Sequence, residues 1–207
     1  NAIGGIIKIS SIEFIPKDTL FGGVFASYHD NGKLNSSSVR INKTKKNGFF
    51  TTLRMGLKSS GDLKSPDYFL TNSGYNEKSG SFSIGNKSLN RMWRLGYSIF
   101  RKELGILKAS HVGNPGDVFR ALDSDVPTII NPYSRKISHP RQLTTHNKVF
   151  GNYNLYFKNL SKINFNYVYQ KNRREEFDFR LGLSDEIPSI DITLQTHDLN
   201  IDYESNK

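Results

Sequence analysis

The sequence predicts an all-β fold built from long antiparallel strands, and three observations point to this class. Phenylalanine (14) and tyrosine (10) are frequent and 17 glycines supply turns, whereas methionine (2) and tryptophan (1) are rare. Apolar and polar residues alternate over stretches that are long for a soluble sheet. The links between these stretches fall into a short and a long group, as they do in β-barrels that cross an outer membrane.

The first four strands are delimited by turn-forming segments. The first strand is "LFGGVFASYH", and the hairpin-sized "DNGK" follows it. "KKNG" makes the second tight link, and the much longer "SGDLKSPDYFLTNSGYN" leads to the fourth strand. The expected ranges are 20–29, 33–46, 48–60 and 76–87.

The last four strands show the alternation most clearly. In "RMWRLGYSIFRK", Trp93, Leu95 and Tyr97 face away from Arg94 and Ser98. The pattern repeats in "VFGNYNLYFKN", where Tyr153, Leu155 and Phe157 oppose Asn152 and Asn154, and in "KINFNYVYQKN", where aromatic residues oppose asparagines. The expected ranges are 91–108, 145–159, 161–179 and 190–204.

The connections in this second half also divide by length. "SLNR" and "NLSK" are short, whereas long loops follow the fifth and the seventh strands. In the first of these long loops, "DVFRALDSD" has helical spacing and predicts a short helix. Apart from the short "DNGK" after the first strand, short turns at one end and long loops at the other indicate an antiparallel transmembrane β-barrel. A transmembrane helix is excluded because no apolar run approaches 18 residues.

Two groups of segments carry a family resemblance. The opening "NAIGGIIKIS" looks like the end of a plug domain, where an Ala-Ile-Gly-Gly segment leads into the last plug strand. "ELGIL", "SHVGN", "DVFRAL", "ISHPRQLTTHNKVFGNYNLYF", "NRREEFDFR" and "IPSIDITLQTHDLNIDYE" follow in family order. Together they resemble the first part of the barrel in TonB-dependent outer-membrane receptors of the Bacteroidetes type.

The resemblance implies that the chain is a fragment, an incomplete barrel of about eight strands from a larger plugged barrel. Residues 1–15 would be the end of the plug and a linker, and residues 16–207 the N-terminal part of the barrel. Such a receptor lies in the bacterial outer membrane among its lipids and takes up a scarce nutrient, such as a ferric siderophore or another metal chelate. Energy reaches it from the TonB–ExbB–ExbD complex through an N-terminal segment that this sequence lacks.

Two sets of residues are candidates for binding. Arg40, Arg54 and Arg94 lie opposite the apolar alternation, so we expect them to face the lumen, where buried charges need carboxylates and carbonyls of the plug as partners. Six residues in or beside the long loop are candidates for a ligand vestibule: His111, Tyr133, His139, Arg141, Gln142 and His146. The plainer interpretation is that the histidines are polar loop residues that contact other loops or the plug.

Enzymatic, metal and cofactor chemistry has no support in the sequence. There is no cysteine, and no two histidines have the spacing of a helical metal site. Glu175 and Glu176 adjoin Arg173 and Arg174, which indicates an exposed charge ladder rather than an acid–base pair. "GNPGDVF" lacks the lysine of a phosphate-binding loop. We therefore expect a protein that is not an enzyme and has no cofactor.

The net charge of +10 raises nucleic acid as a partner. Because the basic residues are scattered and form no basic helix, we expect a solvated lysine-rich surface and no nucleic-acid binding. Two alternatives to the receptor remain open, a small closed eight-stranded barrel of structural or pore function and a soluble basic β-rich binding protein. The polar "DYESNK" and the opening Gly-Gly strand count against the small barrel.

Overall fold

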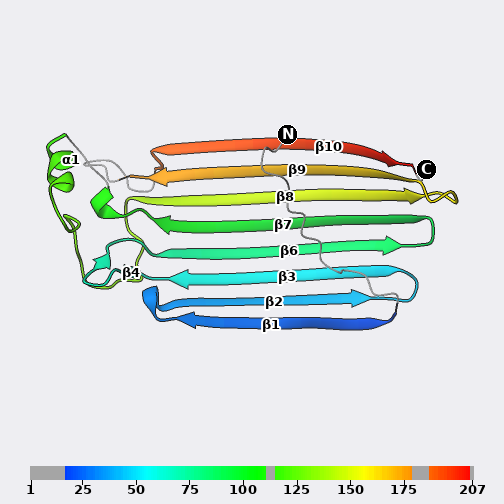
Figure 1. Cartoon of the computed structure of the whole chain (residues 1–207), viewed down its shortest axis with the longest axis horizontal. Helices are drawn as coiled ribbons and strands as arrows, with labels where there is room; N and C mark the ends of the chain where they lie inside the picture. The colour runs from blue at the N-terminus through cyan, green and yellow to red at the C-terminus, as the bar shows by residue number, and fades with distance from the viewer. Residues whose placement is uncertain (1–16, 111–114, 179–186, 206–207) are drawn as a thin grey trace.

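The computed structural model describes residues 17–110, 115–178 and 187–205, and its main element is one antiparallel sheet of eight strands (Figure 1). The spatial order of the strands equals their order in the chain, so the sheet is a continuous meander. Its strands are β1 (Thr19–His29), β2 (Leu34–Thr44), β3 (Phe49–Ser60), β6 (Tyr75–Lys87), β7 (Arg91–Gly105), β8 (Arg141–Tyr156), β9 (Lys162–Phe177) and β10 (Ile190–Glu204).

All eight predicted strands are present, and the main difference lies at the ends of β7 and β8. The predicted range 91–108 ends at Gly105, and the strand predicted from residue 145 already begins at Arg141. The Ile106 amide donates to the Pro140 carbonyl (2.9 Å), so the β7–β8 pairing passes directly into the packing of the loop. The predicted plug segment, residues 1–15, lies outside the described residues.

The long connections contain more structure than the alternation predicts. Between β3 and β6 lie two short strands, β4 (Leu63–Lys64) and β5 (Phe69–Leu70), which pair with each other. The helix predicted in the next long loop is present as α1 (Pro115–Leu122). Short strands of two residues leave no periodic signal, which is why the sequence alone predicts only a loop there.

Connection length differs between the two ends of the sheet, with one exception, the tight β1–β2 link at residues 30–33, which lies at the same end as the long connections (Figure 1). The tight links at residues 45–48, 88–90 and 157–161 lie at one end, which we call the turn end. The long connections, with α1, β4 and β5, lie at the other, which we call the loop end (Figure 1). Gly48 has a φ of +88° in its turn, and a Cβ there would lie 1.8 Å from the Lys87 carbonyl oxygen, so this tight turn requires glycine.

Strand register assigns every side chain to one of two faces, because directly opposed residues share a face and successive residues alternate. One row runs Val39, Met55, Gly80, Ile99 across the neighbouring strands β2, β3, β6 and β7. We call this side the apolar face. On the opposite side, the polar face, Arg40 opposes Arg54. In these rows the aliphatic side chains lie on one face and the charged ones on the other.

The sheet is open, and the described residues bury little apolar surface. β1 and β10 lie at opposite edges (Figure 1). Within the described ranges the only buried hydrophobic side chains are Phe50 and Phe177. At the turn end of the polar face, Asn42 and Thr52 are buried and joined by a hydrogen bond of 3.0 Å. The strands are thus held by their ladders and by small local clusters rather than by a thick core.

Candidate functional site

The apolar face carries a continuous band of exposed hydrophobic side chains over all eight strands. Val24 on the first edge strand is 81% exposed, and Leu199 on the last is 70% exposed. Soluble proteins rarely expose an apolar patch that extends across a whole sheet. The band consists of Leu20, Val24, Ile41, Leu53, Met55, Phe82, Leu95, Tyr97, Ile99, Val149, Phe165, Tyr167, Leu199, Ile201 and Tyr203.

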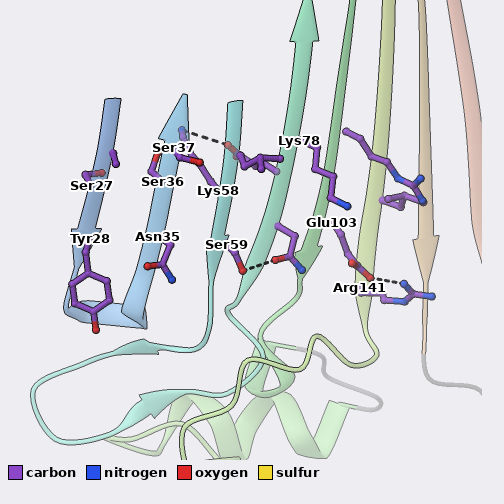
Figure 2. A pocket seen from close by; sticks show the side chains of 16 residues that line it. Ser27, Tyr28, Asn35, Ser36, Ser37, Lys58, Ser59, Lys78, Glu103 and Arg141 are labelled. Atoms are coloured by element: carbon purple, nitrogen blue, oxygen red, sulfur yellow. Dashed lines mark hydrogen bonds and ion pairs between the residues drawn. The ribbon is translucent and has the colours of Figure 1, made fainter. Parts of the chain in front are cut away.

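Between this band and the loop end, the same face becomes polar. Tyr28, Asn35, Ser59, Asn76 and Glu103 form one row across β1, β2, β3, β6 and β7. The hydroxyl of Ser59 donates to the Asn76 side-chain oxygen (2.8 Å), as Figure 2 shows. These residues line an open groove of about 1080 Å³ that reaches from β1 to β8. The face therefore has an apolar zone and a polar zone along the strand direction.

The loop end is fixed by two buried polar side chains, Asp62 and Asn72. The Asp62 carboxylate accepts from the backbone amides of Ser73 and Ser134, both at 3.1 Å. The Asn72 amide donates to the carbonyls of Ile106 (2.8 Å), Ser138 (3.0 Å) and Pro140 (2.8 Å). These contacts hold the end of the β7–β8 connection against the β3–β6 connection.

Sequence reasoning did not single out Asp62 or Asn72. Both lie in a stretch whose only visible signal is turn composition, "SGDLKSPDYFLTNSG". Asn72 has a φ of +67°, a conformation for which asparagine is favoured among residues other than glycine. Asn and Asp side chains in loops often form hydrogen bonds with backbone groups, but the sequence does not indicate which segment supplies those groups.

Tyr133, a vestibule candidate, is part of this loop packing. Its hydroxyl donates to the Gly32 carbonyl (3.3 Å), and its ring lies 5.6 Å from that of Phe69. The Lys33 ammonium lies 4.7 Å from the centre of the same ring. Tyr133 therefore joins the β1–β2 turn to the two long connections. His111, another candidate, lies outside the described residues.

The remaining vestibule candidates are divided between the two faces. Arg141 lies on the apolar-face side of β8, forms an ion pair with Glu103 (2.6 Å, Figure 2), and has His139 beside it at 3.5 Å. Gln142 and His146 alternate to the polar face, where His146 contacts Asn172 (3.3 Å). The structure therefore does not gather the described candidates into one cluster, and the vestibule stays a prediction.

The three arginines predicted to face a lumen share the polar face. Arg40 and Arg54 oppose each other on β2 and β3. Arg94 on β7 donates to the Ser83 hydroxyl (3.2 Å), and its guanidinium lies 4.9 Å from the centre of the Phe150 ring. Their contacts with a plug stay a prediction.

Charged side chains at the loop end are mostly paired. Glu77, on the polar face, receives Lys58 at 3.4 Å and Lys102 at 3.2 Å. Arg173 donates to both carboxylate oxygens of Asp191, at 2.9 and 2.7 Å. Such exposed pairs add register specificity more than stability.

Residues 17–110, 115–178 and 187–205 contain no group of three or more His, Asp or Glu side chains placed to hold a metal ion. No helix in this part of the chain has the length and hydropathy to cross a bilayer.

Comparison of the chain with protein-family models, with curated proteins and with solved structures found no match.

Proposed function

We propose that this chain is the lipid-facing wall of an outer-membrane β-barrel, and that the barrel is a TonB-dependent receptor that imports a scarce nutrient such as a ferric siderophore. The observation that carries the membrane part is the exposed apolar band over all eight strands. Burial of such a band in hydrocarbon gains roughly 25 cal/mol for each Å² removed from water. The receptor part rests on the segment resemblance.

The two ends and the second face support the same proposal. Short turns at one end and, apart from the tight β1–β2 link, long and internally packed connections at the other match the asymmetry of outer-membrane barrels. The polar face, with Arg40, Arg54 and Arg94, suits a lumen filled by a plug.

The free edges of β1 and β10 require further strands in a bilayer, because lipid cannot satisfy unpaired backbone groups. In the proposed receptor these strands complete the barrel. A small barrel closed by these eight strands alone would need β1 beside β10, and the structure has them at opposite edges (Figure 1).

Single cysteines test the orientation, since the sequence has none of its own. Ile99→Cys lies on the apolar face and Ser98→Cys on the polar face of the same strand. In outer-membrane fractions of cells that express the complete reading frame, we expect Ile99→Cys to react with a lipid-soluble maleimide and Ser98→Cys to show the lower reactivity towards it. Equal labelling of the two, or recovery of the protein in the soluble fraction, would refute the membrane proposal.

Deletion of the gene tests transport separately. We expect the deletion strain to grow poorly on chelated iron and normally on abundant ferrous salt, with the defect reproduced by loss of TonB. Correct labelling of the cysteines together with normal growth on chelated iron would leave the barrel standing and remove iron import.

A further inference from the structure

Lys78 and Arg101 form a like-charge pair at the rim of the loop-end groove that lies nearest to the apolar band. They are directly opposed on β6 and β7, and both are exposed. Like charges in directly opposed positions destabilise a sheet. Neither side chain has an acidic partner among the described residues. Two cations are thus held side by side at one point of the apolar face.

The neighbouring cations differ because they are neutralised. Lys58 and Lys102 share Glu77 on the polar face, and on the apolar face Arg141 pairs with Glu103, which lies in the row next to Lys78 and Arg101. The acidic side chain of the neighbouring row on this face, Glu103, is therefore directed to Arg141. The groove retains an uncompensated positive charge at Lys78 and Arg101. Lys78 is seen near the Glu103–Arg141 ion pair in Figure 2.

The position of this pair relative to the apolar band indicates an amphipathic ligand. Ile99, two residues from Arg101 on the same face, belongs to the band, and Leu57 directly opposes Lys78. On the other side the groove offers neutral hydrogen-bonding groups from Tyr28, Ser59 and Asn76. A molecule that spans this border needs apolar chains on the side of the apolar band and an anionic, hydrogen-bonding head on the side of the loop end.

We propose that Lys78 and Arg101 bind the phosphate of an anionic lipid headgroup whose acyl chains cover the apolar band. This inference rests on the proposed membrane location. Arginine presents a planar fork to phosphate oxygens and lysine a compact charge, so the pair supplies complementary contacts. The bound anion would also remove the repulsion between the two cations.

Local lipid binding tests the proposal on the protein expressed from its complete reading frame, in a cysteine-free background, and reconstituted in phosphatidylcholine vesicles. A bimane fluorophore at Leu57→Cys reports on the groove, and headgroup-spin-labelled phosphatidylglycerol or phosphatidylcholine serves as quencher. We expect phosphatidylglycerol to be preferred, and the preference to fall about 5-fold with Lys78→Gln and again with Arg101→Gln, because each basic side chain near an anionic surface is worth about that factor. Lys148→Gln, on the polar face, is the matched control and leaves the preference unchanged.

Each other outcome has a defined meaning. Equal quenching by the two lipids, or a preference that survives the double substitution, overturns the lipid site while the membrane location stands. Loss of phosphatidylglycerol quenching on addition of inorganic phosphate identifies a site for free anions and also overturns it. Absence of quenching by either lipid in every variant overturns the proposed function itself.

Discussion

The ring of Phe150 on β8 lies over Gly96, the residue directly opposite it on β7. A Cβ at Gly96 would come within 2.4 Å of the ring carbon Cζ. Phe50 and Gly85 repeat the relationship between β3 and β6, also at 2.4 Å. On the polar face an aromatic ring thus covers the bare backbone of a glycine, a known device for pinning strand register.

Gly96→Val should therefore destabilise the sheet by about 1–3 kcal/mol, because the added carbons displace the Phe150 ring. Gly80→Val is the control, since a Cβ at Gly80 meets only the Ile99 side chain at 3.7 Å. Unfolding in urea with detergent-solubilised protein measures both. Phe150→Ala should abolish most of the difference between the two valine variants, and a penalty of equal size in that background would show that the ring is not its cause.

Asn72 controls the packing of the loop end. Asn72→Gly keeps the positive φ but removes the amide that bonds three carbonyls, so we expect about 2–3 kcal/mol less stability for the docked β7–β8 connection. Limited proteolysis of residues 106–140 should then be roughly 30- to 150-fold faster, because cleavage follows the population of the open loop. Asn131→Gly, an exposed position in the same connection, should cleave at the parent rate. Equal rates for the two variants would mean that Asn72 does not hold the loop.

The membrane-facing assignment predicts opposite effects at adjacent residues of β10. Leu199 belongs to the apolar band and Asn200 to the polar face. Leu199→Arg should cost about 2–4 kcal/mol if the residue lies near the bilayer midplane, whereas Asn200→Arg costs little. The amount of heat-modifiable protein in the outer membrane measures the difference. A similar loss for both variants would indicate that β10 has no lipid-facing side.

The strands were predictable because alternation is a local property of the sequence. The apolar side of β9 can be predicted from Ile163, Phe165 and Tyr167 alone, without knowledge of any other strand. Register and loop packing depend on distant residues, such as the 68-residue separation between Asn72 and Pro140, and leave no periodic trace.

β10 shows a second limit of periodicity. Ile190, Ile192 and Leu194 lie on the polar face, whereas Leu199 and Ile201 lie on the apolar face, so the apolar residues change sides within one strand. Alternation therefore predicts that a strand exists better than it predicts which side faces which solvent along its whole length. The described vestibule candidates lie apart for a related reason, because Arg141 and Gln142 are consecutive and point to opposite faces.

Arg94 offers the sharpest test of the proposed lumen. Its guanidinium lies over the Phe150 ring and donates a hydrogen bond to Ser83, so contacts within the sheet alone hold it on the polar face. Arg94→Glu reverses the charge that the proposed plug would meet, and we expect increased entry of large antibiotics through the variant with unchanged insertion in the outer membrane. Arg94→Lys keeps the charge and should leak less than Arg94→Glu. If Arg94→Glu leaks no more than the parent, Arg94 does not seat a plug, and its role is limited to packing against β8.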